Sequence, residues 1–218
     1  MSADASTLPR PFATPPAWAR AQLANVDELL LEQAHLEKKA AAGAVAFLFR
    51  VPLDAKLHKQ LSALAREELV HFERTLKLLD QRGVAFETQT SSGYAEKLKK
   101  AIRRDYTGRL CDELLVAAII EHRSHERMGL LAAALAEAEP EVARFYADLC
   151  PAEERHEQLY VDLATLVVDA DAVRTRYREL AEHEAQVLRT LPFGARLHGG
   201  LPSGCSAGSS AGVAAGEA

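Results

Sequence analysis

The sequence predicts an all-α protein: a bundle of four long helices with a long crossover connection and an extra C-terminal helix. Three observations favour this class. The 218 residues, enough for one packed domain, are rich in Ala, Leu, Glu and Arg, which are strong helix formers. Aromatic residues make up only 6% of the chain, and β-branched residues do not form alternating runs. Four long segments repeat apolar residues at spacings of three and four, the period of an amphipathic helix.

The first half of the chain predicts two long helices after an extended, Pro-rich arm over residues 1–16. The first helix begins near residue 17, because Pro16 suits a first helical turn, and it ends near residue 50, just before Pro52. Asp54 is a good N-cap for a second helix that ends near residue 81. Gly83 stands where that helix needs a C-terminal stop.

The second half begins with a connector, in which a polar stretch over residues 83–93 is followed by a short basic helix over 94–104. This connector is too long for a turn between antiparallel neighbours, and its length is typical of a crossover between the halves of a bundle. The remaining helices are expected over residues 107–137, 141–168 and 171–190.

Pro151 lies inside the fourth predicted bundle helix and predicts a kink there. The last helix carries many charges and is expected to pack outside the bundle, so that the helical domain spans residues 17–190. The Gly/Ser/Ala-rich tail over residues 191–218 has too few large apolar side chains for a core and is expected to be disordered.

The bulk composition limits the possible functions. The net charge of -5 excludes a strongly basic nucleic-acid binder, although one local basic patch stays compatible with RNA. Cys111, Cys150 and Cys205 form no C-x-x-C pair, and an odd number gives no disulfide framework. The N-terminus has no apolar signal core, and no stretch reaches the roughly 20 apolar residues of a membrane span. We therefore expect a soluble protein of the reducing cytoplasm, without a membrane partner.

Each of the four bundle helices carries a carboxylate at a position where its stripe should be apolar. On two helices a histidine follows three residues later, and residues three apart share a helix face. In each half of the chain a lone glutamate precedes the Glu-x-x-His pair by a similar distance, 31 and 32 residues. This repeat is the arrangement of ferritin-like di-metal carboxylate proteins. The predicted ligands of two metal ions are Glu37, Glu68, His71, Glu121, Glu153 and His156.

Charge supports this prediction, because four buried carboxylates without a counter-charge would be costly, and two divalent cations would neutralise them. Oxygen and imidazole ligands suit iron or manganese. The alternative is that these residues are surface acids on charged helices. The spacing selects Glu121 rather than Glu126, and Glu67 and Glu154 lie roughly 100° from the ligand face, toward solvent. The nearby carboxylates that compete for a place in the site are Glu32, Glu67, Glu113, Glu126 and Glu154.

Three further features have two interpretations each. His125 lies one turn after Glu121 and is either a neighbour of the metal site or a hydrogen-bonded core histidine. Tyr160 either holds the second ring nitrogen of His156 or packs in the core. The small residues over 40–44 either leave room for dioxygen and a substrate chain or allow close helix packing.

A basic cluster on the connector is the remaining candidate site. Such a run is usually a solvated face, and its sharper interpretation is contact with RNA phosphates. Its members are Lys97, Lys99, Lys100, Arg103 and Arg104.

Several segments resemble the bacterial tRNA-(2-methylthio-N6-isopentenyladenosine) hydroxylases, which belong to the ferritin-like di-iron superfamily. The resemblance covers about residues 12–190 and departs from the family pattern at His122, at His125 and in the tail. The matching segments are PPAW over 15–18, DELLLEQAHLEKKAA over 27–41, AREELVHFE over 65–73, IEHRSHERM over 120–128 and AEERH over 152–156.

The resemblance implies a non-haem di-iron monooxygenase that uses dioxygen and two electrons to hydroxylate the isopentenyl group of modified adenosine 37 in tRNA. It implies that the six predicted ligands bind two iron ions. The implied partners are the tRNA anticodon stem-loop, which the basic connector would contact, and an unidentified electron donor such as a ferredoxin and its reductase.

Two other functions are compatible with the pattern. One is a ferritin-like or rubrerythrin-like protein that oxidises iron or handles peroxide without an organic substrate. The chain lacks the Cys pairs of rubrerythrins, which speaks against that form. The other is a helical binding module with a degenerate, metal-free site, against which the symmetric set of six ligand-type residues argues.

Overall fold

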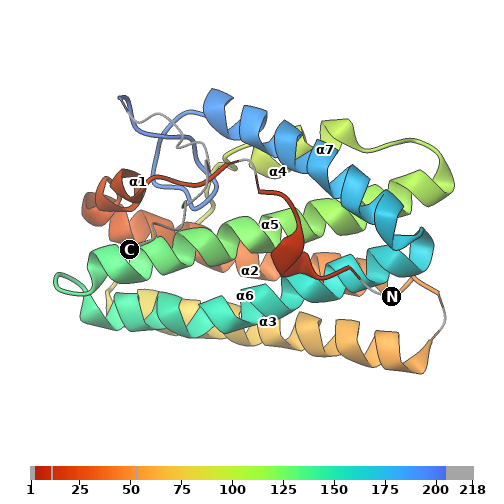
Figure 1. Cartoon of the computed structure of the whole chain (residues 1–218). Helices are drawn as coiled ribbons and strands as arrows, with labels where there is room; N and C mark the ends of the chain where they lie inside the picture. The colour runs from red at the N-terminus through yellow and green to blue at the C-terminus, as the bar shows by residue number, and fades with distance from the viewer. Residues whose placement is uncertain (1–2, 11, 53, 205–218) are drawn as a thin grey trace, which may run out of the picture.

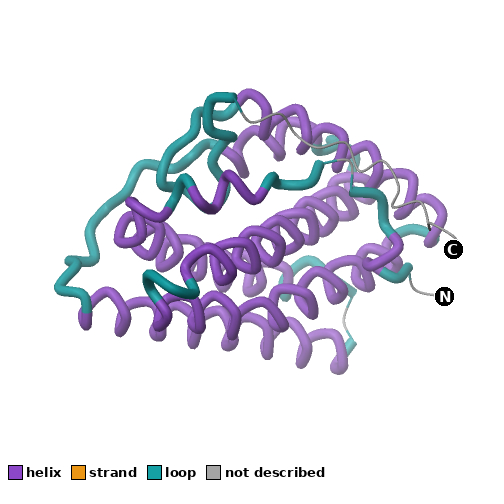
Figure 2. Tube along the Cα trace, turned by 60° about the vertical axis from the view of Figure 1, so that its left-hand side comes forward, coloured by secondary structure: helices purple, strands orange, loops and turns teal. Residues whose placement is uncertain are grey.

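The computed structural model describes residues 3–10, 12–52 and 54–204. Over these residues the chain forms helices joined by loops and no strand (Figures 1 and 2). The all-α prediction is therefore confirmed. None of the described helices is long and apolar enough to cross a membrane.

Four long helices make up the bundle (Figure 1). They form two pairs with extensive packing, α2 with α3 and α5 with α6. The long connection between α3 and α5 is the predicted crossover. The bundle helices are α2 (Val26–Phe47), α3 (Ala55–Gln81), α5 (Tyr106–Leu135) and α6 (Pro140–Val167).

Local signals set the helix boundaries much as the sequence predicts. The Asp54 carboxylate accepts hydrogen bonds from the backbone N–H groups of Lys56, at 2.8 Å, and Leu57, at 3.0 Å. Gly83 follows α3 with φ of +69°, a left-handed conformation that favours glycine at a helix C-terminus. Pro140 begins α6, and Pro151 lies inside this helix; the kink expected there stays a prediction.

The first predicted helix is wrong as a single element. The chain forms a short helix α1 (Pro16–Arg20), then a 3-10 turn η2 (Leu23–Asn25), and only then α2. Asn25 has φ of −126° and ψ of 27°, outside the helical region. The break lets α1 bury Trp18 completely, beneath the guanidinium of Arg127 on α5, which lies 4.4 Å from the indole ring centre. Tertiary burial therefore overrides local helix propensity here.

The crossover contains a short helix α4 (Tyr94–Leu98) and a 3-10 turn η3 (Lys99–Ala101). Tyr94 and Leu98 are buried, and α4 packs against the last helix, α7 (Ala170–Thr190). Helix α7 lies outside the four bundle helices, as predicted, and covers α5 (Figure 1).

The predicted disordered tail is wrong for its first part. Leu197 and His198 are buried, and Arg127 donates to the carbonyl oxygens of Leu197 at 2.6 Å and Gly199 at 2.7 Å. A buried guanidinium needs several acceptors, and this segment supplies them. The composition of the tail does not indicate that its carbonyl oxygens accept hydrogen bonds from a buried arginine. Residues 205–218, including Cys205, lie outside the described residues.

The N-terminal arm also packs on the bundle. Among its described residues it forms one 3-10 turn, η1 (Ala5–Thr7), and is otherwise non-helical up to Pro15. The backbone N–H of Ala5 donates to the side chain of Gln158 on α6 at 2.8 Å. Both ends of the helical region therefore contact the bundle.

The hydrophobic core is divided into two clusters. On every bundle helix the predicted metal ligands separate them: on α5, Leu114 and Ile119 belong to one cluster and Met128 and Leu131 to the other, with Glu121 between. The predicted ligands therefore form a polar layer in the middle of the bundle, closed off by apolar packing on both sides.

Candidate metal centre

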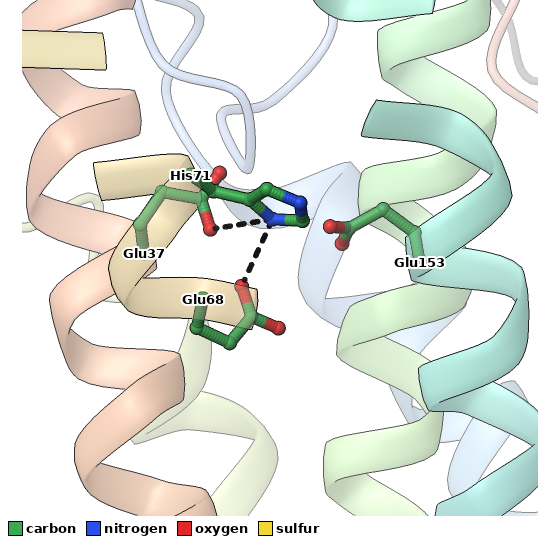
Figure 3. Close-up of side chains that lie close together, drawn as sticks. All are labelled: Glu37, Glu68, His71 and Glu153. Carbon is green, nitrogen blue, oxygen red and sulfur yellow. Dashed lines mark ion pairs between the residues drawn. The ribbon is translucent and has the colours of Figure 1, made fainter. Parts of the chain in front are cut away.

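The structure brings the six predicted ligands together from four helices. Glu37 lies on α2, Glu121 on α5, and the two Glu-x-x-His pairs on α3 and α6. All six side chains are buried, with at most 5% of each residue exposed. Figure 3 shows Glu37 of α2, Glu68 and His71 of α3, and Glu153 of α6 pointing into one space.

The six residues form two overlapping groups, each with ligand atoms within 4.8 Å of one another. The first group is Glu37, Glu68, His71 and Glu153, and the second is Glu68, Glu121, Glu153 and His156. Glu68 and Glu153 belong to both. The geometry therefore suits two neighbouring cations that share two carboxylates, a division of roles that the spacing alone left open.

Several buried polar atoms in this centre have no hydrogen bond. Both carboxylate oxygens of Glu68, one oxygen of Glu153 and Nδ1 of both histidines are unsatisfied. Nδ1 of His156 lies 2.8 Å from a Glu68 oxygen, and Nδ1 of His71 lies 3.4 Å from the other, but neither contact has hydrogen-bond geometry. Unsatisfied buried polar atoms are costly. Acidic oxygens and imidazoles with free lone pairs fit two divalent cations.

Burial and charge shift the pKa values of these groups strongly. Burial raises the pKa of Glu37 to about 8, and burial together with the nearby Glu68 raises that of Glu121 to about 7. Burial, followed by the neighbouring carboxylates, also raises the pKa of Glu153 well above its usual range. Burial alone would raise the pKa of Glu68, but the two imidazoles outweigh it and lower the pKa. The metal-free centre therefore holds protons that cations would displace.

Because of these shifts, the metal-free protein should lose stability as the pH rises. Glu37 and Glu121 have native pKa values above the ordinary 4.5, so the native state binds more protons than the unfolded chain between about pH 4.5 and 8. His71 acts in the same direction. Burial lowers its pKa, but Glu37 and Glu68 raise it to about 9, and the stability this gives below pH 6.5 is lost through about pH 9. Glu68 is ionised in both states across this range and adds no slope.

We therefore expect the melting temperature, measured with a chelator present, to fall between about pH 5 and 9. The Glu37→Gln variant should show a shallower fall, because one of the titrating groups is gone. A metal-free melting temperature that is flat or rising between about pH 5 and 8 in the parent protein, or an unchanged slope in the variant, would contradict this account.

Two side chains orient the predicted ligands from outside the cluster. Nε2 of His156 lies 3.0 Å from Glu67, which also accepts from Arg155 at 2.5 Å. Gln33 donates from Nε2 to Glu37 at 2.6 Å. No sequence pattern predicts either role. The angle of Glu67 on α3 predicts a solvent-facing side chain, and it is partly exposed, but α6 packs close enough for contact.

The structure decides between the alternatives for two other residues. His125 belongs to neither metal group, and its Nδ1 lies 2.9 Å from the carbonyl oxygen of Cys150, so it is a hydrogen-bonded histidine between α5 and α6. Tyr160 does not hold His156, because Glu67 does. Its ring packs 5.6 Å from that of Phe47.

The carboxylates that competed for the site lie elsewhere. Glu32 accepts from the backbone of Leu197, and Glu126 accepts from Thr14 at 2.6 Å. Glu113 binds Arg109 at 2.9 Å. Glu154 is exposed. The choice of Glu121 rather than Glu126 by half-to-half spacing agrees with this geometry.

A cavity of about 740 Å³ adjoins the centre. Glu37, Glu68, Glu121 and Glu153 line it, and α2 and the crossover form much of its wall. Small residues leave this space open, whereas Ala41 and Ala44 are buried in helix packing, so each interpretation of the small-residue run holds for part of it. The small lining residues of α2 are Ala40, Ala42, Gly43 and Ala46.

The basic cluster lies partly at this cavity. Lys99 lines it together with Arg50 and Arg109, and a second pocket of about 490 Å³ shares Lys99 and Arg109 and adds Arg104. Lys99, Lys100 and Arg104 are exposed and form no ion pair within the described residues.

Arg103 and Lys97 differ from the other three members of the basic cluster. Arg103 is exposed but binds the fully buried Asp112 at 2.7 Å, which removes it from the predicted free cations, and this ion pair fixes the connector to α5. Lys97 is half-buried on α4, and its carbonyl oxygen contacts the ring of His183 at 3.0 Å. The cationic surface is therefore smaller than the sequence predicts.

Comparison with known proteins identifies relatives over nearly the whole chain. A family model described as tRNA-(MS[2]IO[6]A)-hydroxylase (MiaE) matches residues 10–199. Two curated relatives are named tRNA 2-(methylsulfanyl)-N(6)-isopentenyladenosine(37) hydroxylase. The one from Pseudomonas putida is 34% identical over 194 residues, or 89% of this chain and 93% of the relative. The one from Salmonella typhimurium is 33% identical over 152 residues, or 70% of this chain and 55% of the relative.

Among solved structures, one described as "Protein 43 with aldehyde deformylating oxygenase activity from Synechococcus" matches with a TM-score of 0.79. It is 36% identical, over 89% of this chain and 98% of that chain. The family model spans all six predicted ligands and most of the described residues. The fold is ferritin-like, and the chain belongs to the MiaE family of tRNA hydroxylases.

Proposed function

We propose that this protein hydroxylates the isopentenyl group of 2-methylthio-N6-isopentenyladenosine 37 in tRNA, with dioxygen and two electrons. The observation that carries the proposal is a buried cluster of four carboxylates and two histidines that opens into a cavity with a cationic rim, in a chain of this family. The curated relatives are named for this reaction, at up to 34% identity.

The six predicted ligands would hold two iron ions, with Glu68 and Glu153 shared. Iron, when bound, would supply the reduction and activation of dioxygen for attack on a C–H bond. The residues of the chain orient the metal ligands and the substrate and exclude water from the site. Glu67 and Gln33 hold His156 and Glu37 in place, and the buried Tyr160 and Phe47 form an apolar wall of the cavity. The small residues of α2 leave room for the prenyl chain.

Electrons and tRNA come from outside the chain. The donor we propose is a small redox protein such as a ferredoxin with its reductase, and the location is the cytoplasm, where tRNA is modified. The anticodon loop would approach the cationic rim, where Lys99, Lys100 and Arg104 contact its phosphates and the modified base enters the cavity.

Reversing the charge of these three side chains to glutamate should weaken tRNA binding and reduce its salt dependence. Each lost phosphate contact removes roughly 0.7–0.9 from the slope of log Kd against log salt. Filter binding of tRNA across a salt series measures both. The triple variant Lys56→Glu/Lys59→Glu/Lys77→Glu, which reverses three exposed charges on α3, is the matched control. Equal affinity and slope in the rim variant and the parent protein would remove these residues from the RNA contact.

The function itself is tested by mass spectrometry of tRNA nucleosides from cells with and without this protein. We expect the hydroxylated nucleoside only when the protein is present, and loss of that nucleoside when Glu153 is replaced by alanine. Hydroxylated nucleoside in both strains would contradict the tRNA proposal while leaving the metal centre open to other chemistry.

A second candidate is oxygen-dependent deformylation of an aldehyde, because the matched solved structure carries that activity in its description at 36% identity. The cavity can accept an apolar chain. Incubation of the iron-loaded protein with a long-chain aldehyde and a reductant, followed by gas chromatography, separates the two. Product from the aldehyde and none from tRNA would favour this candidate. Rapid iron oxidation without either product would instead favour a ferritin-like oxidase.

A further inference from the structure

Two aromatic side chains at one end of the bundle are far more exposed than is usual. Phe49 is 85% exposed and Tyr106 is 80% exposed, and no other large hydrophobic side chain of the described residues exceeds 53%. Neither ring is among the residues that line the cavity. A single exposed apolar side chain needs no explanation. The positions of these two rings relative to the cavity, however, indicate a function for them.

Both aromatics are next to residues of the cavity rim. Phe49 immediately precedes Arg50, after the end of α2, and Tyr106 begins α5 one turn before Arg109. Arg50 and Arg109 both line the cavity, and both form ion pairs with the same carboxylate, Glu113. The end of α2 and the beginning of α5 are therefore held together. In Figure 1 both lie at the right-hand end of the bundle.

The surface around these rings is cationic. Lys99 lines the rim, Lys100 and Arg104 follow it along the chain, and all three are exposed without an ion pair among the described residues. Exposed rings beside unpaired cations suit a partner with flat, apolar faces joined by anions. Single-stranded RNA has this chemistry, since its bases stack on aromatic rings and its phosphates bind Lys and Arg. A duplex hides the faces of its bases.

We propose that Phe49 and Tyr106 stack on unpaired bases of the RNA loop that flank the modified adenosine while that adenosine occupies the cavity. This inference rests on the proposed tRNA substrate and extends it. Stacking would hold the neighbouring bases out of their own stack and so help to splay the reactive nucleotide toward the metal centre. It would be tolerant of base identity, because every base has an apolar face.

The test compares Phe49→Ala, Tyr106→Ala and Tyr106→Phe with the parent protein. The probe is a synthetic anticodon stem-loop RNA with 2-methylthio-N6-isopentenyladenosine at position 37 and 2-aminopurine beside it, whose fluorescence falls when it stacks. Each alanine variant should weaken binding about 5- to 100-fold and lose part of the fluorescence quenching. Tyr106→Phe, which keeps the ring, should retain both. KM for the RNA should rise while kcat at saturation stays close to that of the parent.

Two comparisons separate stacking from other causes. The salt slope of binding should stay unchanged in the alanine variants, because no phosphate contact is lost. Phe193→Ala, at an exposed aromatic beyond α7, is the matched control and should bind normally. Iron content should match the parent in all variants, and the melting temperature should match it in the Phe49 and Tyr106 variants, whose rings are mostly exposed.

The outcomes distinguish this inference from the proposed function. If the parent protein binds and hydroxylates the RNA but the two alanine variants bind it within about twofold of the parent, with full quenching, this inference alone is overturned. An equal loss of RNA binding in Phe193→Ala would also overturn this inference alone. If the parent neither binds nor hydroxylates the RNA, the proposed function fails, and this inference fails with it.

Discussion

Replacing Glu153 by glutamine should abolish binding of the two proposed iron ions and reduce the proposed hydroxylation by more than about 100-fold. Substitution of a side chain that only hydrogen-bonds to a metal ligand typically lowers metal affinity or activity about 10- to 100-fold. Glu153→Gln is expected to do more, because it removes a negative charge from both ligand groups. Glu153 belongs to both ligand groups, so its loss cannot be confined to one cation. Metal analysis of protein expressed with iron measures the effect directly.

The matched control is Glu154→Gln, at the adjacent, exposed glutamate of α6. It should keep full metal content and activity. The metal-free Glu153→Gln protein should be no less stable than the metal-free parent, because Glu153 has a strongly raised pKa and its carboxylate gains nothing from being ionised there. Only the gain in melting temperature on adding Fe(II) should disappear. A variant that retains two iron ions per chain would show that Glu153 is not a shared ligand.

Replacing Arg123 by methionine should destabilise the protein by about 3–5 kcal/mol, which corresponds to a fall of about 6–20 °C in melting temperature for a chain of this size. Arg123 and Glu184 are both 2% exposed and are joined by two hydrogen bonds, at 2.8 and 3.0 Å. Removal of the guanidinium leaves Glu184 with the hydroxyl of Tyr94, at 2.8 Å, as its remaining hydrogen-bond partner. An uncompensated buried carboxylate is costly.

The double variant Arg123→Met/Glu184→Leu separates the charge effect from packing. It should recover much of the lost stability, because the buried Glu184 carboxylate is removed together with its partner, and Glu126, which Arg123 also contacts, keeps its hydrogen bonds from Thr14. Arg174→Met, whose ion pair with Asp171 is exposed, should change the melting temperature little. Chemical denaturation monitored by circular dichroism measures all four proteins. A double variant as unstable as Arg123→Met would show that packing, rather than the unpaired charge, is responsible.

This buried pair has a consequence for the site. Tyr94 and Ser124 line the cavity together with His198, whose ring stacks on Tyr94 at 4.7 Å. The Arg123–Glu184 pair therefore holds α7 and the crossover in place over the cavity wall. Loss of the pair should loosen that wall.

The predicted ligands could be identified from the sequence because helix periodicity is a local property. A glutamate and a histidine three residues apart share a face on any helix, so Glu68 and His71 were paired before any tertiary information. The repeated spacing then selected Glu121. The helix ends at Asp54 and Gly83 were predictable for the same reason, since caps depend on the nearest few residues.

What depended on contacts between distant segments could not be predicted. Glu67 faces away from the ligand side of its own helix, and only the packing of α6 brings it to His156. The sequence predicts Arg103 to be a free cation, whereas the fold places Asp112 within ion-pair distance of it. The segment after α7 has the composition of a disordered tail, yet residues 194–199 are held by the buried Arg127 and by Gln22.

The bundle class, the long helices apart from the break before α2, and the six candidate ligands were predictable from the sequence, because each follows from the spacing of residues within one helix or from a repeat of that spacing. The three-dimensional structure was needed to show that Glu68 and Glu153 belong to both candidate ligand groups, which side chains contact this cluster, and which residues line the cavity. Those properties depend on how four helices approach one another. That approach is set by the summed packing of many side chains, which no local pattern in the sequence records.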